Sequence, residues 1–367
     1  MSQSLPIRVQ PGAANYFSHP GALEQIEAFY PAAALKRVLW ISGVRALAAA
    51  RPYLPSLFTD AKTLNVSFDG HCSESQVRRF SALGAEADLV IGLGGGSVLD
   101  TAKAVASRLG KPFVAMPTIA ATCAAWTPLS VWYDDAGTAL RFELFPHPSH
   151  VVLVEPRILL AAPAEYLRAG IGDTLAKWYE AVVLCEREAD LPLTAQLGLA
   201  AALQLKEVLL AEGADALSDA AAGRLSERFM HVVDAIIAGG GLVGGLGERY
   251  TRLAAAHAIH NGLTVLPATA RFLHGTKVAY GILVQLALEE KFAELKRLAA
   301  ALKALGLPTR LAELDVDFAN AAQIDALVAH TLRPHETIHY LSGTVDAARL
   351  KRALEVVEML DKDRLAA

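Results

Sequence analysis

From Lys36 to Leu159, short apolar runs rich in β-branched residues alternate with longer amphipathic segments. The amphipathic segments GVRALAAARPYL (43–54) and SVLDTAKAVASRLG (97–110) have helical spacing. Strands that alternate with helices form a parallel sheet covered by helices. The runs that predict strands are RVLWIS (37–42), TLNVSF (63–68), DLVIGLG (88–94), PFVAMPT (112–118) and HVVLVEP (150–156).

After Pro163 nearly every segment has helical periodicity, including 173–188, 191–213, 248–263 and 347–363. A chain of 367 residues also exceeds the size at which one core usually keeps growing. We therefore expect an α/β dinucleotide-binding domain with a Rossmann-like parallel sheet over residues 1–162, and an all-α domain over residues 163–367. The glycines of AGGGLVGGLG (238–247) either break a helix or permit a close approach of backbone or ligand.

Composition and charge exclude several classes of protein. The chain has 34 basic and 38 acidic residues without a dense basic run, which argues against binding to nucleic acid or to an anionic membrane. Its cysteines, Cys72, Cys123 and Cys185, form neither a disulfide framework nor a thiolate zinc motif. No signal peptide and no bilayer-spanning apolar stretch is evident. We expect a cytoplasmic protein with small-molecule ligands.

The run DLVIGLGGGSVLDTAKAVA places Gly94, Gly95, Gly96 and Ser97 between an apolar strand and a helix that contains Asp100. Glycines let backbone N–H groups approach a pyrophosphate, and the start of a helix adds partial positive charge. The sequence lacks the third glycine of the ordinary Rossmann fingerprint, because Ser97 stands at that position. The loop predicts a non-standard dinucleotide site; the alternative is a tight turn in any α/β protein.

Three residues form a second candidate site. Asp173, in RAGIGDTLAKWYEA, is expected to open a helix, where an N-cap carboxylate is the alternative interpretation. His257 and His260 lie three residues apart on one helix face, and His274 precedes a glycine. A carboxylate and neutral imidazoles suit catalytic zinc or ferrous iron. A histidine taken alone is more often a satisfied core or surface residue than a metal ligand, and no HExxH-like signature is present.

Five motifs together resemble the iron-containing alcohol dehydrogenase superfamily, specifically its glycerol dehydrogenase-like branch. The resemblance spans nearly the whole chain in the same order, and it implies a dehydroquinate synthase-like fold. Three segments, 117–133, 236–257 and 330–341, are most similar to members that reduce 2-oxo acids with NADPH. The five motifs are GLGGGSVLDTAKA, MPTIAATCAAWTPLSVWY, GIGDTLAKWYEA, AAAHAIHNGLTVLP and FLHGTKVAYGILVQL.

The resemblance implies that Asp173, His257 and His274 bind one divalent cation. His260 would then orient His257, bind substrate or take part in a proton relay. Members that use iron carry a further histidine where this chain has Lys177, so zinc is favoured over iron, nickel or manganese. The resemblance also implies contacts with the pyrophosphate for Gly95, Gly96, Ser97 and Asp100. It implies contacts with ribose and nicotinamide for Thr118, Thr122, Thr127, Leu129, Val131 and Tyr133, whose threonines alternatively satisfy local backbone groups.

Departures from glycerol dehydrogenases point to an acidic substrate. Cys123 replaces an aspartate that contacts the polyol, which removes repulsion towards a carboxylate. Arg252, with Arg249 nearby, precedes His257, and a guanidinium suits bidentate binding of a carboxylate. We expect Arg252 to bind the substrate carboxylate, with Lys177 as an alternative; otherwise Arg252 pairs with Glu248 or is solvated.

Cofactor preference follows from the end of the first predicted strand. Val44 stands where NAD-dependent relatives have a ribose-binding aspartate, and Arg45 follows it. Loss of a carboxylate beside a new cation favours NADP(H) over NAD(H).

The expected reaction is reduction of a 2-oxo acid such as 2-oxobutanoate or 2-oxoglutarate to the 2-hydroxy acid. The alternatives are an NAD-dependent glycerol or vicinal-diol dehydrogenase, a lyase similar to dehydroquinate synthase, and a binding protein without activity. Relatives form dimers or rings of dimers, so a homo-oligomer is expected by resemblance.

Overall fold

The computed structural model describes residues 6–55, 63–135 and 137–360. These residues form two compact units, each taken by itself below. The sheet unit comprises 10–164 and 218–245, and the helical unit comprises the described residues of 1–9, 165–217 and 246–367. A division into domains at residues 162 and 163 stays a prediction; the segment 218–245 belongs with the sheet unit.

The sheet unit is built on a parallel six-stranded sheet with the strand order β1-β8-β5-β4-β2-β3. Every residue of β2, β4, β5 and β8 is buried, as expected for parallel strands covered on both faces. A separate antiparallel pair joins β6 to β7. The strands are β1 (Asn15–Ser18), β2 (Val38–Ser42), β3 (Thr63–Ser67), β4 (Leu89–Gly94), β5 (Phe113–Pro117), β6 (Leu129–Tyr133), β7 (Ala139–Leu144) and β8 (Val151–Val154).

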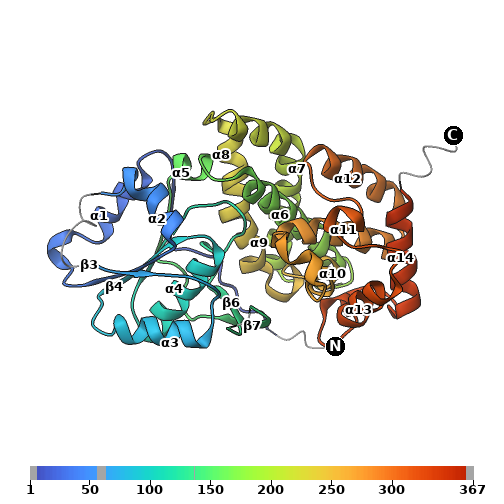
Figure 1. Ribbon diagram of the computed structural model, residues 1–367, viewed down its shortest axis with the longest axis horizontal. Helices are drawn as coiled ribbons and strands as arrows, with labels where there is room; N and C mark the ends of the chain where they lie inside the picture. Colours follow the sequence, from blue (N-terminus) through green and yellow to red (C-terminus); the bar gives the residue numbers. More distant parts are fainter. Residues whose placement is uncertain (1–5, 56–62, 136, 361–367) are drawn as a thin grey trace. The chain divides into compact units, whose positions relative to one another are not determined.

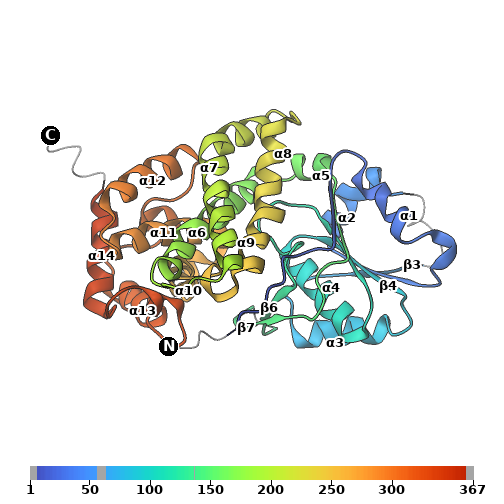
Figure 2. The ribbon, with the colours of Figure 1, turned by 180° about the vertical axis from the view of Figure 1, so that it is seen from behind.

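Helices cover both faces of this sheet. Figures 1 and 2 show α3 and α4 together on one side of it and α2 on the other. The helix α4 begins directly after the glycine loop and ends where Gly110 adopts a left-handed conformation (φ 62°). The helices of this unit are α1 (Ile26–Phe29), α2 (Val44–Ala50), α3 (Glu74–Leu83), α4 (Gly96–Leu109), α5 (Pro156–Leu160) and α8 (Glu227–Asp234).

The predicted parallel sheet followed by a helical part is confirmed. All five expected strands are present, and the two expected helices correspond to α2 and α4. Three strands were not predicted. β1 is short, and β6 and β7 have the mixed burial of a hairpin instead of the apolar runs of the central strands.

The helical unit contains no strand among its described residues. Its helix α10 packs against α11 and α13, an arrangement visible in Figure 1. The remaining helices are α6 (Ala164–Cys185), α7 (Leu193–Ala221), α9 (Gly240–Gly247), α10 (Ala255–Thr264), α11 (His274–Leu288), α12 (Phe292–Ala304), α13 (Ala321–Thr331) and α14 (Ala347–Met359), of which α6, α7 and α9 each run across the division between the units.

The glycine-rich stretch 238–247 continues a helical path through a π-helical turn, Ala235–Gly239, into α9. A Cβ atom at Gly241 would lie 2.4 Å from the side chain of Trp126, and one at Gly245 would lie 2.3 Å from the carbonyl oxygen of Gln10. These two glycines therefore permit close packing within the sheet unit, which decides between the two expectations for this stretch.

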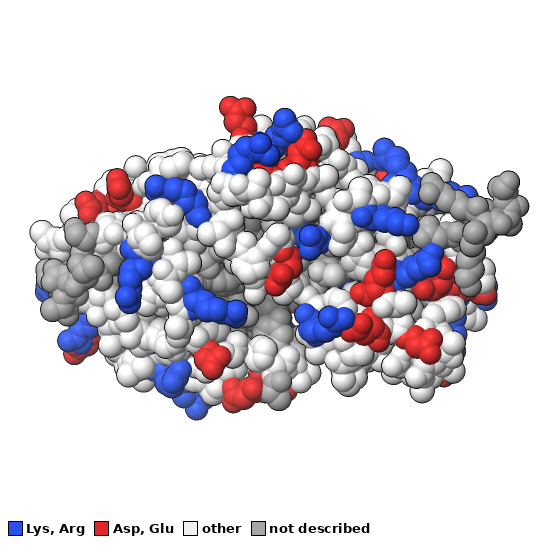
Figure 3. All heavy atoms as spheres, turned by 45° about the horizontal axis from the view of Figure 1, so that its top comes forward, with Lys and Arg blue, Asp and Glu red and all other residues white. Residues whose placement is uncertain are grey.

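Two helical stretches, Leu193–Ala221 and Glu227–Tyr250, pass a test of length and apolarity for crossing a bilayer, which the sequence analysis did not expect. Their apolar windows are 28% and 56% buried, respectively. Length and apolar composition alone do not make either stretch a clear membrane span. On the face in Figure 3, basic and acidic side chains are interspersed, which agrees with the absence of a basic run in the sequence.

Candidate metal centre and dinucleotide loop

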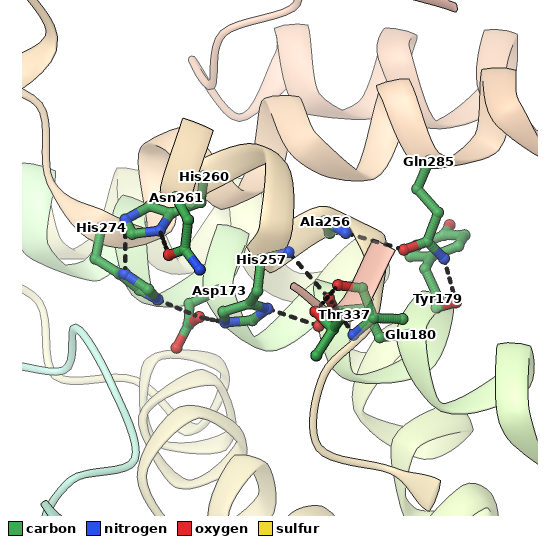
Figure 4. Close-up of polar contacts among 11 residues, drawn as sticks. Asp173, Tyr179, Glu180, Ala256, His257, His260, Asn261, His274, Gln285 and Thr337 are labelled. Carbon is green, nitrogen blue, oxygen red and sulfur yellow. Dashed lines mark hydrogen bonds and ion pairs between the residues drawn. The ribbon is translucent and has the colours of Figure 1, made fainter. Parts of the chain in front are cut away.

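Asp173, His257 and His274 converge on one point of the helical unit, with their ligand atoms all within 4.8 Å of one another. Asp173 Oδ1 lies 3.3 Å from Nε2 of His257 and 3.3 Å from Nε2 of His274 (Figure 4). The side chains of Asp173 and His257 are 6% and 11% exposed, whereas that of His274 is 41% exposed. The cluster is therefore buried on one side and open to solvent at His274.

Glycines allow the three helices that carry these residues to approach closely. A Cβ atom at Gly275, next to His274, would lie 1.9 Å from the carbonyl oxygen of Ala169 in α6. A Cβ atom at Gly281 would lie 2.3 Å from the carbonyl oxygen of Ala256, next to His257. Larger residues at these positions would push α11 away from α6 and α10, so the glycines set the spacing of the ligands.

Asp173 lies inside helix α6, which begins at Ala164. The expectation that Asp173 opens a helix, with an N-cap role as the alternative, was therefore wrong. Gly172, directly before it, marks a contact of α6 with α11 and not a helix start. Lys177 and Glu180 follow Asp173 on the same face of α6, at spacings that bring side chains together.

Glu180 joins α6 to the beginning of α10. Its Oε1 accepts hydrogen bonds from the backbone N–H groups of Ala254 (2.7 Å) and His257 (3.0 Å). Its Oε2 lies 2.7 Å from His257 Nδ1. Helix α10 has no side-chain cap of its own, so the fully buried Glu180 supplies the acceptor that its first N–H groups need. Gln285 of α11 accepts the N–H of Ala256 in the same way (3.0 Å, Figure 4).

The hydrogen bond of His260 to another histidine goes to His274 and not to His257. Its Nε2 lies 3.0 Å from His274 Nδ1, and its Nδ1 lies 3.1 Å from Asn261 Oδ1 (Figure 4). Of the roles expected for His260, orientation of His257 therefore belongs to Glu180, while His260 orients the other imidazole.

The electrostatics of the cluster favour a positive ion. Burial opposes ionisation of Asp173, but the imidazoles of His257 and His274 that face it, together with the charge of Lys177, outweigh burial and hold the pKa of Asp173 well below its usual value. Burial also opposes a charged His257, yet Glu180 and Asp173 raise the pKa of His257 to about 9. Burial and the charge of His274 lower the pKa of His260 well below its usual value.

The donor set fits a divalent metal. Within the described residues, Asp173 Oδ1 is a buried oxygen without a hydrogen-bond partner, and two imidazole Nε2 atoms face it. One carboxylate oxygen and two imidazole nitrogens, with solvent access beside His274, are typical of a catalytic zinc site that keeps open positions. Their Nδ1 atoms are both engaged by other side chains, as in metal sites whose ligands are held by neighbours.

The glycine loop of the sheet unit lies beside the topological switch point, where successive strands of the chain are added to opposite sides of β2. From β2 the chain passes to β3 on one side and then to β4 on the other. Val44 follows β2 and Gly95 follows β4, so both lie at the carboxyl edge beside this switch point, the usual ligand position in such sheets. Val44 is 73% exposed, and Arg45 is also exposed.

The glycines of this loop differ in how closely they are packed. A Cβ atom at Gly94 or Gly95 would lie 2.7 or 2.8 Å from the side chains of Val98 or Ile119, so close packing requires these glycines. A Cβ atom at Gly96 would meet Thr122 Oγ1 at 3.4 Å and the Cβ atom of Ala124 at 3.8 Å, both of which are ordinary contacts. Packing therefore does not require a glycine at position 96, and contact of Gly96 with a pyrophosphate at the first turn of α4 stays a prediction.

Sequence similarity relates this chain to known oxidoreductases. The family pattern described as iron-containing alcohol dehydrogenase matches residues 13–156. The chain is 58% identical to hydroxycarboxylate dehydrogenase A of Escherichia coli over 354 residues, which is 96% of this chain and 98% of that protein. This chain belongs to the iron-containing alcohol dehydrogenase family.

Glycerol dehydrogenases are further relatives in this family. The enzyme of Thermotoga maritima is 40% identical over 290 residues, covering 77% of this chain and 78% of its own length. The crystal structure of glycerol dehydrogenase from Schizosaccharomyces pombe superposes with a TM-score of 0.87 at 26% identity, covering 98% of this chain and 92% of that one. Membership implies an oxidoreductase that uses NAD(P) and a divalent metal.

The residues expected to bind substrate occupy different surroundings. Lys177 is buried, and its charge helps to lower the pKa of Asp173 and of Glu180. Arg252 is half-buried three residues before α10; burial lowers its pKa, and the charge of Glu248 opposes that shift. Arg249 instead stacks on the ring of Tyr250.

Cys123 lies in the sheet unit, in the loop after β5. Its carbonyl oxygen accepts the N–H groups of Trp126 (3.0 Å) and Thr127 (3.1 Å). Its backbone therefore shapes the loop, while substrate contact by its side chain stays a prediction.

The residues expected along the ribose and nicotinamide lie in β6 and in the segment that joins β5 to β6. Leu129, Val131 and Tyr133 alternate along β6 on its partly exposed face, while the residues between them are buried. The N–H of Thr118 donates to the carbonyl oxygen of Gly94 (3.1 Å), which places it at the glycine loop. Thr122 accepts the N–H of Ala124 at 3.4 Å, as in the local-backbone alternative.

The carboxylate of Asp100 is bound by a backbone N–H group and by a lysine of the same unit. Its Oδ2 accepts the N–H of Val131 (3.0 Å), and its Oδ1 lies 3.4 Å from Lys103 Nζ. Lys103 also donates to the carbonyl oxygens of Ala124 (2.8 Å) and Leu129 (2.5 Å). Burial raises the pKa of Asp100 and lowers that of Lys103, and their attraction opposes both shifts. The pair fixes β6 and the preceding loop against α4.

Four charged residues close to these sites were not predicted from the sequence: Lys103, Glu180, Lys277 and Glu336. The first three lie inside the motifs quoted above, but nothing in their spacing distinguished them from surface charges. Lys277 follows His274 by one helical turn, is 6% exposed and has a pKa lowered by burial. Glu336 lies far along the chain from the ligands it serves.

Replacing Lys103 by methionine is expected to lower the free energy of unfolding by about 3 kcal/mol, because the change leaves the Asp100 charge buried without its partner. Urea unfolding measures this loss. The matched control is Lys36→Met at an exposed lysine of the same unit, which should change stability little. Equal stabilities of the two variants would contradict the structural role of Lys103.

Proposed function

We propose that this protein reduces 2-oxo acids to 2-hydroxy acids with NADPH and a divalent cation, for which zinc is favoured. The observation that carries the proposal is the convergence of Asp173 Oδ1 with His257 Nε2 and His274 Nε2. The name of the 58% identical relative supports the substrate class. We further propose a cytoplasmic homo-oligomer; light scattering on the purified protein tests the assembly.

The chain's own residues have distinct tasks in this reaction. When bound, the cation polarises the ketone oxygen and NADPH supplies the hydride. Asp173, His257 and His274 hold the cation, and the exposed side of His274 leaves access for substrate. Arg252 binds the carboxylate of the 2-oxo acid, with Lys177 as the alternative.

The cofactor is held by the sheet unit. Gly95, Gly96 and Ser97 present the first N–H groups of α4 to the pyrophosphate, because those groups have no partner within the helix. The exposed face of β6 lies along the ribose and nicotinamide. Arg45, exposed in the first turn of α2, binds the 2′-phosphate.

The direct test compares two assays of one zinc-loaded preparation. NADPH oxidation is measured with 2-oxobutanoate and with 2-oxoglutarate, and NAD reduction is measured with glycerol. The proposal predicts a higher kcat/KM in the first assay and loss of activity after chelation. Glycerol dehydrogenase relatives at up to 40% identity favour NAD-dependent polyol oxidation as the second candidate, and a higher kcat/KM with glycerol would establish it.

Cofactor preference is tested at Val44. Val44→Asp is expected to shift the ratio of kcat/KM for NADPH over NADH by about 10- to 100-fold towards NADH, because a carboxylate repels the 2′-phosphate and accepts ribose hydroxyls. Val44→Asn is the matched control of similar shape without the charge. Steady-state kinetics with both cofactors measures the ratio. An unchanged ratio in Val44→Asp would show that this position does not face the ribose.

A further inference from the structure

A hydrogen-bonded chain of side chains leads away from the metal centre on the His274 side. His274 Nδ1 lies 3.0 Å from His260 Nε2, and His260 Nδ1 lies 3.1 Å from Asn261 Oδ1 (Figure 4). Asn261 Nδ2 donates to Glu336 Oε2 at 2.9 Å. The chain ends at Arg333, whose Nη2 donates to Glu336 Oε1 at 2.6 Å. Glu336 is 6% exposed, so water competes little for its oxygens.

The chemistry of each group fixes the direction of the hydrogen bonds. An ionised carboxylate only accepts, so Asn261 turns its NH2 group to Glu336 and its oxygen to His260. His260 Nδ1 must then carry the proton, which leaves its Nε2 as the acceptor for His274 Nδ1–H. His274 is thereby left with a lone pair on Nε2, the atom that faces Asp173.

The backbone around Glu336 is built against α10. A Cβ atom at Gly262 would lie 2.0 Å from Thr331 Oγ1 and 2.8 Å from the carbonyl oxygen of Leu327, so this glycine lets α13 approach α10 beside Asn261. The residue after Glu336, Thr337, donates its hydroxyl to the carbonyl oxygen of Ala254 at the start of α10. The segment is therefore held at two points along the helix that carries His257 and His260.

We propose that Glu336 is a positioning residue for the metal centre, because it sets the tautomer of His274 through Asn261 and His260. The inference rests on the proposed function only in taking His274 as a metal ligand. His257 has its own anchor in Glu180, so the two imidazoles are oriented by independent carboxylates.

The test reverses the direction of the hydrogen bonds from Glu336 to His274 with a substitution that keeps the shape of the side chain. In Glu336→Gln the oxygen of glutamine faces Arg333, which can only donate, and the NH2 group faces Asn261. Asn261 then turns its oxygen to Gln at 336 and its NH2 group to His260, so His274 Nε2 acquires a proton. Zinc affinity of the metal-free protein, measured by competition with a chromophoric chelator, is expected to fall about 10- to 100-fold.

A second substitution restores the original direction of these hydrogen bonds. In the double variant Asn261→Asp with Glu336→Gln, the aspartate accepts from both neighbours, and the net charge equals that of the wild type. This variant is expected to recover most of the lost zinc affinity, which a merely structural defect would not allow. Glu355→Gln, at an exposed glutamate of the same unit, is the matched control and should bind zinc like the wild type.

A direct measurement covers the case in which a variant does not fold. ¹⁵N NMR of histidine-labelled wild-type protein, with the signal assigned by its loss in His260→Gln, should show His260 protonated on Nδ1. Protonation on Nε2, or unchanged zinc affinity in Glu336→Gln, would overturn the inference. Failure of the wild type to bind zinc would instead overturn the proposed metal centre. The His260 tautomer would still test the direction of the hydrogen bonds between Glu336 and His274.

Discussion

Asp173→Asn is expected to lower kcat for 2-oxobutanoate reduction by about 10³-fold and to abolish tight retention of zinc. The reason is the buried Oδ1 atom, which lies 3.3 Å from both imidazole Nε2 atoms and has no hydrogen-bond partner among the described residues. Asparagine keeps the shape of the side chain and removes its charge. Metal content after dialysis, measured by mass spectrometry, and NADPH oxidation check the result.

The matched control is Asp325→Asn, at an exposed aspartate in α13 of the same unit. It should retain both zinc and turnover. Circular dichroism of the metal-free proteins establishes that each variant is folded. An Asp173→Asn protein that keeps one zinc per chain and full activity would remove Asp173 from the metal centre.

Arg252→Ala is expected to lower kcat/KM for 2-oxobutanoate by about 10²-fold, the effect of losing a charge-assisted hydrogen bond to the substrate carboxylate. Hydroxyacetone, a ketone without a carboxylate, should be reduced equally well by wild type and variant. The comparison isolates carboxylate binding from metal chemistry, because both substrates present a carbonyl to the same centre. Steady-state kinetics with NADPH measures both values.

Arg297→Ala is the control for removal of an arginine, since Arg297 is exposed and pairs with Glu294. Equal losses with both substrates would mean that Arg252 supports the fold of α10 and does not bind the carboxylate. Unchanged turnover of both would direct the same assay to Lys177, and then to Lys277, the buried lysine one turn after His274.

The strands of the sheet unit were predictable because each central strand is buried on both faces. Such strands are continuous apolar runs, and β2, β4, β5 and β8 all have this pattern. The hairpin strands β6 and β7 escaped prediction because polarity does not follow burial in them: the burial of β6 (LSVWY) alternates, but a serine is buried and apolar residues lie on the partly exposed face, while β7 is largely exposed. The start of α6 was misplaced because glycine is a poor helix former, whereas Gly172 in GIGD lies inside α6 at its contact with α11.

Motifs and their order were sufficient to nominate Asp173, His257 and His274, and the structure places their ligand atoms together. The residues that orient them were beyond sequence reasoning. Glu180 resembles any helical glutamate until α6 packs beside the start of α10, where its two oxygens accept three hydrogen bonds. His260 was assigned several roles by its spacing, and only the packing of α10 against α11 shows that it contacts His274.

The sequence by itself determined the parallel sheet, the glycine loop that opens α4, the nomination of the metal ligands and the family, since these depend on local pattern and motif order. Tertiary structure alone decided which charged groups are buried and what each one faces. The ligands Asp173 and His274 are about a hundred residues apart in the chain. Their geometry follows from helix packing at Gly275 and Gly281, and distances set by such packing leave no periodic signal in the sequence.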